Sequence, residues 1–124
     1  MTPRRFIAIG AALGALGVAA GAFGAHALKD TITPEWIKVF ETATRYHLVH
    51  AVVLVATGLV ASKWPSSWVN AAGYLFLSGV VLFSGSLYAL VFSNTSWWGM
   101  VTPFGGVALV AGWCALAWGV WEKK

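Results

Sequence analysis

Charged residues are scarce in this sequence. They make up only 10% of the 124 residues, whereas a soluble domain usually carries about a quarter. Hydrophobic residues account for 59% of the chain, and the mean hydropathy is +0.75. A soluble globular domain of this composition would leave large apolar surfaces in water. That class is therefore excluded, and an integral membrane protein is indicated.

Cysteines and catalytic motifs are scarce as well. The single cysteine, Cys114, excludes an intramolecular disulfide. The sequence contains no nucleophile beside a base, no phosphate-binding glycine loop and no His-Glu-x-x-His motif. We therefore expect that the protein is not an enzyme.

The net charge of +4 does not form a recognition face for nucleic acid. Most of the basic residues lie beside the ends of apolar segments, namely Arg4, Arg5, Lys63, Lys123 and Lys124. This placement is typical of membrane topology and of contact with lipid headgroups. We expect the lipid bilayer as a partner, and no nucleic acid.

Long apolar segments fill most of the sequence. They cover residues 6–26, 36–61, 69–92 and 104–121. Each is long enough, at about 1.5 Å per residue, to cross a hydrocarbon core of about 30 Å. The connections leave no room for a soluble domain, so residues 1–124 are expected to form a single integral membrane domain. The predicted fold is all-α: a tight, left-handed bundle of four transmembrane helices.

The end of the first apolar segment has two interpretations. Ala25-His26-Ala27 has the small-x-small pattern of a signal-peptidase site, but the apolar run before it exceeds the roughly 7 to 15 residues of a cleaved signal. The run also carries regularly spaced glycines: Gly10, Gly14, Gly17, Gly21 and Gly24. These glycines share one helical face, against which another helix can approach closely. We therefore expect a retained first span.

The last apolar segment repeats this packing pattern. Its small residues are Gly105, Ala108, Gly112, Ala115 and Gly119. Small residues favour close helix packing in lipid, where association depends on van der Waals contact and on hydrogen bonds between helices. The sequence does not indicate whether these glycine-lined faces meet each other, or another copy of the chain.

The distribution of lysine and arginine predicts the orientation. With four spans both termini lie on one side, and that side collects the five basic residues named above. The other side has basic residues balanced by Asp30, Glu35 and Glu41. By the positive-inside rule we expect both termini in the cytoplasm, and a multi-pass protein of the bacterial inner membrane.

The second span has a clear start and two distinct faces. Thr33-Pro34-Glu35 predicts a helix N-terminus, with a hydroxyl cap, a proline and an acid in the first turn. One stripe is predicted to face headgroups and lipid: Lys38, Glu41, Arg45, Val49, Val52, Ala56 and Leu59. The opposite stripe is predicted to face the bundle: Trp36, Phe40, Ala43, His47, His50, Leu54, Thr57 and Ala61. Glu41 and Arg45, four residues apart, are expected to form a helix ion pair.

Three histidines are the main candidates for chemistry. His26 ends the first span, and His47 and His50 lie on the inward face of the second, so all three are expected at a similar depth. Such a cluster is compatible with metal, haem or proton binding. However, no acid or cysteine completes a metal shell, and the glycine faces indicate a core too tight for haem. We therefore favour hydrogen bonds between helices, without metal or cofactor.

Serines in the third span complete the candidate polar cluster, which comprises His26, His47, His50, Ser84 and Ser86. Ser84 and Ser86, near Tyr88, are compatible with the lining of a pore. Serines in such positions more often bond to the preceding helical turn or to a neighbouring helix.

Five stretches together resemble a known family. They are GAFGAHALKD (21–30), FETATRYHLVHA (40–51), FSGSLY (83–88), TPFGG (102–106) and AGW (111–113). The sequence is similar to the small bacterial inner-membrane proteins of domain of unknown function 423, which has animal relatives among small transmembrane proteins. The resemblance covers nearly the entire chain and implies four spans and an envelope location. The family is uncharacterised, so the resemblance implies no activity and no catalytic residues.

Some residues of this sequence match signature positions of that family. They are His26, His50, Ser84 and the turn Thr102-Pro103. His47 stands where the family pattern leads us to expect Gln, so a histidine pair is not implied for the family as a whole.

These observations favour a structural or accessory membrane protein that packs against itself or a larger membrane complex. The alternative is a small oligomeric transporter or channel with a polar path. That path would be lined by His47, His50, Thr57, Ser84 and Ser86.

Overall fold

The structure, a computed structural model, describes residues 1–123 and consists of four long helices. Helix α1 (Pro3–Phe23) continues into a π-helical turn (Gly24–Leu28), and α2 spans Pro34–Lys63. Helix α3 spans Ser67–Ser93, a 3-10 turn follows at Ser96–Met100, and α4 spans Thr102–Trp121. All four helices are long and apolar enough to cross a membrane. The predicted all-α fold with four membrane-spanning helices is confirmed.

Local sequence signals set the helix ends. Thr33 caps α2, because its hydroxyl accepts a hydrogen bond from the Trp36 amide at 3.4 Å, and Pro34 follows at the first helical position. The hydroxyl of Ser66 caps α3 in the same way, from the Trp68 amide at 3.1 Å. Helix α3 ends at Asn94, whose φ of 53° lies in the left-handed region. The predicted start of α2 is confirmed.

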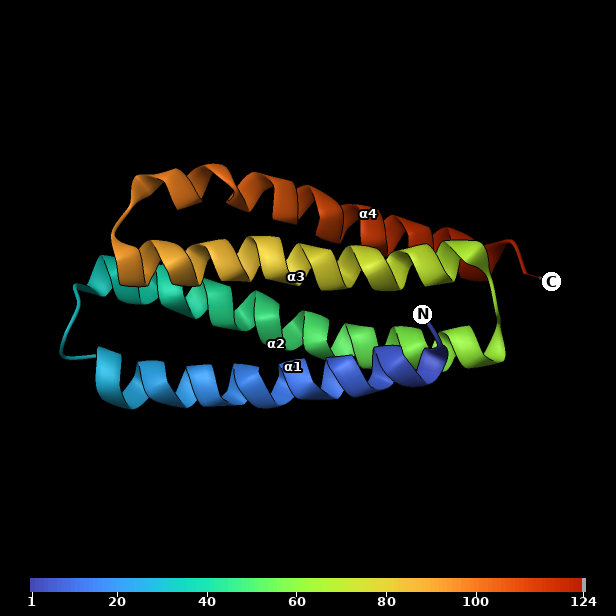
Figure 1. The fold of residues 1–124 in the computed structure, drawn as a ribbon, viewed down its shortest axis with the longest axis horizontal. Coiled ribbons are helices and arrows are strands. Elements are labelled where there is room, and N and C mark those ends of the chain that lie inside the picture. Colours follow the sequence, from blue (N-terminus) through green and yellow to red (C-terminus); the bar gives the residue numbers. More distant parts are fainter. Residues whose placement is uncertain (124) are drawn as a thin grey trace.

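The helices lie side by side in chain order (Figure 1). Helix α1 packs on α2, α2 on α3, and α3 on α4, while α1 and α4 lie at opposite edges. Short connections make consecutive helices antiparallel neighbours. Both termini therefore lie at one end of the bundle, together with the α2–α3 connection. We call the other end, with residues 24–34 and 93–102, the hairpin end.

Glycines of α1 pack against α2. A Cβ atom on Gly10 would lie 2.8 Å from Val55, and one on Gly17 would lie 2.6 Å from Leu48. Gly24 fits equally closely against the Phe40 ring. These three glycines are seven residues apart, so a seven-residue repeat forms the contact. Gly14 and Gly21 flank it, with a Cβ at 4.0 Å from Ala51 and 3.4 Å from Thr44.

Glycines of α4 pack against α3 in the same manner. A Cβ atom on Gly105 would overlap the Phe83 backbone, and one on Gly112 would lie 2.9 Å from the Phe76 ring. Gly119 sits against Trp68 and Val69. The spacing is again seven residues. Within the chain, each glycine-lined face thus packs against the neighbouring helix of its own hairpin, and the two faces do not meet each other.

The two faces of α2 lie as predicted. Residues on the inward stripe are buried, among them Phe40, Leu54 and Thr57. Residues on the opposite stripe are exposed, among them Val52 and Leu59. All four helices contribute to the core. Its buried members are Phe6, Leu54, Ala72, Phe76, Val80, Leu109 and Ala115.

Candidate functional site

His47 joins three helices. Its Nε2 lies 2.8 Å from the carbonyl oxygen of Leu13 in α1, and its Nδ1 lies 2.9 Å from the hydroxyl of Tyr88 in α3. A carbonyl oxygen only accepts, so Nε2–H donates to Leu13. In the neutral ring the hydrogen is therefore on Nε2, Nδ1 accepts from the Tyr88 hydroxyl, and both nitrogens are occupied.

A glycine of α1 gives His47 access to that carbonyl. Gly17 lies one helical turn beyond Leu13, and a Cβ there would come within 3.4 Å of the His47 ring carbon Cδ2. A larger side chain would stand between the imidazole and the α1 backbone. The glycine repeat thus serves helix packing and also this hydrogen bond.

His50 makes a different contact, toward α4. Its Nδ1 donates to the Tyr46 carbonyl oxygen one turn earlier at 2.8 Å, so its hydrogen is on Nδ1. Its Nε2 accepts a hydrogen bond of 3.1 Å from the indole nitrogen of Trp113. Positions three apart on a helix diverge by about 60°. His47 and His50 therefore point to different neighbours and carry opposite neutral tautomers.

The serines also link helices. The Ser84 hydroxyl donates to the Ala43 carbonyl oxygen of α2 at 2.8 Å. The Ser86 hydroxyl lies 2.6 Å from that of Thr102 at the start of α4, and also bonds to the Phe83 carbonyl. Thr57, in contrast, bonds only within α2, to the Val53 carbonyl at 2.8 Å. Each of these polar groups is satisfied inside the chain.

The predicted polar residues do not meet at one point. His26 is exposed in the π-helical turn, away from the contacts of His47 and His50. The idea that three histidines gather at one depth is not supported, and residues 1–123 contain no group of three His, Cys, Asp or Glu side chains arranged to hold a metal ion. What the arrangement does is fasten α2 to its three neighbours.

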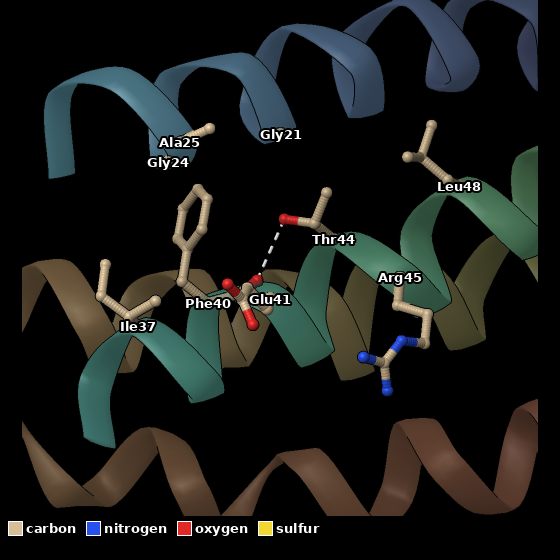
Figure 2. A pocket seen from close by; sticks show the side chains of 9 residues that line it. All are labelled: Gly21, Gly24, Ala25, Ile37, Phe40, Glu41, Thr44, Arg45 and Leu48. Carbon is tan, nitrogen blue, oxygen red and sulfur yellow. Dashed lines mark hydrogen bonds between the residues drawn. The ribbon is translucent and has the colours of Figure 1, made fainter. Parts of the chain in front are cut away.

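Two grooves open beside these contacts. One, of about 680 Å³, lies between α2 and α4 over α3. It is lined by Tyr46, His50, Phe83, Pro103, Gly106, Val107, Leu109, Val110, Ala111 and Trp113. The second, of about 270 Å³, lies between α1 and α2 at the hairpin end (Figure 2).

Three partners of the site were not predicted from the sequence: the Leu13 carbonyl, Thr102 and Trp113. A backbone carbonyl gives no sequence signal. The sequence did contain a signal for Trp113. Most tryptophans lie near the ends of the apolar segments, as in membrane-interface belts, whereas Trp113 lies in the middle of the last apolar segment. A mid-span indole needs an acceptor for its N–H, and His50 provides it.

The fold and its buried hydrogen bonds define a small multi-pass α-helical membrane protein. The chain matches the family described as "Protein of unknown function (DUF423)" over residues 20–106. It is 42% identical to the UPF0382 membrane protein YwdK of Bacillus subtilis over 109 residues, which cover 87% of this chain and 89% of the relative. The chain belongs to this uncharacterised family, as its motifs indicated.

Further relatives support the same assignment. The UPF0382 inner membrane protein YgdD of Escherichia coli is 35% identical over 124 residues, which cover 100% of this chain and 95% of the relative. A UPF0382 membrane protein of Staphylococcus epidermidis is 40% identical over 111 residues, 90% of each chain. The predicted location in the bacterial inner membrane is confirmed by these relatives. No solved structure matches the chain.

Proposed function

We propose that this protein is a non-enzymatic accessory or structural component of the inner membrane, which packs against a larger membrane complex or a second copy of itself. The hydrogen bonding of its buried polar side chains carries this proposal. Within residues 1–123 no buried side-chain nitrogen or oxygen lacks a partner. His47, His50 and Ser84 hold helices together, and their polar atoms are occupied by hydrogen bonds within the chain.

The α2–α4 groove supplies a place for such packing. It is open along the bundle because α4 packs on α3 and α1 lies at the far edge. Its lining is mainly apolar and aromatic, and Gly106 leaves space there, since a Cβ would lie 3.8 Å from the Phe83 ring. A membrane helix with a matching small-residue face would fit along it.

The proposed orientation puts both termini in the cytoplasm. At the terminal end the structure has Arg4, Arg5, Lys63 and Lys123 with a single acid, Glu122, whereas Lys29, Lys38 and Arg45 at the opposite end are balanced by Asp30, Glu35 and Glu41. This asymmetry follows the positive-inside rule. A green fluorescent protein fused after residue 124 should be fluorescent. A fusion to alkaline phosphatase that is active instead would reverse the orientation.

Native mass spectrometry of the protein, gently extracted from its own membrane, tests the proposal. We expect recovery as a stoichiometric part of a larger assembly. Gly106→Leu, which fills the groove, should release the protein from it. Gly85→Leu is the matched control, because nothing lies within 4 Å of a Cβ there. A strict monomer in native lipid, unaffected by either change, would contradict the proposal.

The same experiment addresses the transporter alternative. Recovery as a bare homo-oligomer would direct attention to a path along His47, His50, Thr57, Ser84 and Ser86. Proteoliposomes would then be assayed for flux of protons, small cations and neutral solutes. Flux above that of empty vesicles, lost in Ser84→Ala, would favour transport over an accessory role.

A further inference from the structure

The groove between α1 and α2 at the hairpin end combines an apolar wall with charged residues (Figure 2). Gly21, Gly24 and Ala25 form its α1 side, and Ile37, Phe40 and Leu48 belong to its α2 side. The absence of large side chains on α1 opens this space. Its volume of about 270 Å³ lies near the lower limit of ligand pockets, so it accommodates a slender chain and not a bulky cofactor.

Two opposite charges stand at the edge of this groove. Glu41 and Arg45 both line it and are both exposed. The ion pair predicted from their spacing is not seen: Figure 2 draws both side chains and marks no bond between the guanidinium and the carboxylate. Each charge is therefore available to a ligand.

The depth of the groove places these charges at a membrane interface. Arg45 is the last charged residue of α2 before an uninterrupted uncharged stretch, residues 46–62. Glu41 lies one turn nearer the helix start. A ligand that contacts both charges and the apolar wall must be polar at one end and apolar at the other, as a lipid is.

We infer that this groove binds a glycerophospholipid with an ethanolamine headgroup. Its phosphate would lie against the Arg45 guanidinium, whose planar donors suit phosphate oxygens. Its ammonium would donate hydrogen bonds to the Glu41 carboxylate. The first part of one acyl chain would lie along Gly21 toward Leu48, deeper in the membrane than both charges.

The charge pattern favours the ethanolamine headgroup over two other common phospholipid headgroups, glycerol and choline. A glycerol headgroup has the phosphate but no cation for Glu41. A choline headgroup has the cation but no N–H to donate to a carboxylate. Ethanolamine alone among these three lipids satisfies both Glu41 and Arg45.

The backbone beside the groove is unusual as well. Gly24 and Ala25 belong to the π-helical turn, Gly24–Leu28, with which α1 ends. Such turns are rare and occur frequently at functional sites. This turn falls within GAFGAHALKD, a stretch in which Gly21, Gly24 and the buried Leu28 serve the packing of the bundle.

Competition among lipids tests the inference. The purified protein would be offered equal amounts of phosphatidylethanolamine, phosphatidylglycerol and phosphatidylcholine, and bound lipid would be counted by native mass spectrometry. We expect phosphatidylethanolamine to exceed each of the others by about threefold to tenfold, given partly exposed charge-assisted hydrogen bonds. Equal binding, or a preference for phosphatidylglycerol, would overturn the inference.

Substitutions with matched controls locate the site. Glu41→Gln should abolish the preference for ethanolamine over choline, and Arg45→Gln should reduce binding of all three lipids. Both side chains are exposed, so folding should be unchanged. Glu35→Gln and Lys38→Gln, elsewhere on α2, are the charge controls and should have no effect. Unchanged selectivity in Glu41→Gln would place the lipid elsewhere.

Filling the groove supplies a test that is independent of charge. Ala25→Phe introduces a ring at the hairpin-end side of the space and should obstruct the headgroup, lowering the bound count of every lipid. Ala22→Phe is the control, because Ala22 is exposed on α1 but does not line the groove. Equal lipid counts in the two variants would contradict the inference, whatever the outcome for the accessory role.

Discussion

The two helical hairpins of this protein use the same packing device against different surfaces. In α1–α2, Gly17 and Gly24 meet the side chains of Leu48 and Phe40, whereas a Cβ on Gly10 would lie 2.8 Å from the Val55 amide nitrogen. In α3–α4, Gly112 meets the Phe76 ring, and Gly105 lies directly against the Phe83 main chain. A side chain can rotate to accept a new methyl group, whereas a helix backbone cannot. Gly105 therefore has less tolerance for substitution than Gly17 or Gly24.

The hairpins also differ in charge at their shared end. The α1–α2 connection and the start of α2 hold six charged residues: Lys29, Asp30, Glu35, Lys38, Glu41 and Arg45. The α3–α4 connection, residues 94–101, holds none. The same helix-packing geometry thus supports two kinds of surface, one suited to headgroup contact and one suited to an apolar neighbour.

The largest expected effect is a loss of stability in Gly105→Ala. The added methyl would overlap the Phe83 backbone and force α4 away from α3. Overpacking of this kind costs about 1–3 kcal/mol, and we expect the upper part of that range. Unfolding by SDS in mixed micelles, followed by circular dichroism, measures it.

Gly14→Ala is the matched control on α1. Its Cβ would lie 4.0 Å from the Ala51 methyl, an ordinary van der Waals contact, so stability should change little. Equal losses in the two variants would show that glycine is needed throughout both helices, and the contrast between the hairpins would disappear.

His47→Ala should have the next largest effect, because it removes the hydrogen bonds that join α2 to both α1 and α3. The substitution removes the hydrogen bonds to the Leu13 carbonyl and the Tyr88 hydroxyl and leaves a cavity. An unsatisfied buried polar group costs about 1–3 kcal/mol, and we expect about 2 kcal/mol in the same unfolding assay. His26→Ala, at an exposed position, should be neutral.

A double-mutant cycle separates the hydrogen bond from the cavity. Tyr88→Phe alone should cost less than His47→Ala, and it should cost almost nothing once His47 is absent. Additive losses in the double variant would mean that the hydrogen bond between His47 and Tyr88 contributes nothing to stability.

Much of the fold was predictable because it follows from hydropathy and periodicity. The four spans, the Thr33-Pro34 helix start and the buried stripe through Leu54 and Thr57 were all expected, and the structure has them. These features depend on properties of single segments. A period of 3.6 residues and a bilayer thickness suffice to derive them.

The pairing of groups across helices was not predictable in the same way. A stripe of glycines indicates close approach but not the partner, and the five glycines of α1 gave no sign that Gly10, Gly17 and Gly24 alone form the closest contacts. The histidines looked like one cluster because their places in the first two spans predicted a similar depth. Their three-residue separation instead directs His47 toward Leu13 and Tyr88, and His50 toward Trp113.

The smallest expected effect concerns the contact across the open α2–α4 groove. Trp113→Phe keeps most of the aromatic packing on Phe76 but removes the donor to His50 Nε2. Hydrogen bonds between membrane helices contribute about 0.6 kcal/mol on average, and we expect a loss of that order, with Trp118→Phe as the neutral control. Within residues 1–123 no glycine repeat packs α4 against α2, so this hydrogen bond joins the two helices without that support. Its loss should make the helix segments beside the groove more mobile and leave the rest of the bundle unchanged. Faster hydrogen exchange at the start of α4, with unchanged exchange in α1, would show that the two hairpins respond independently to the substitution. Equal acceleration in both would mean that the four helices respond as one unit.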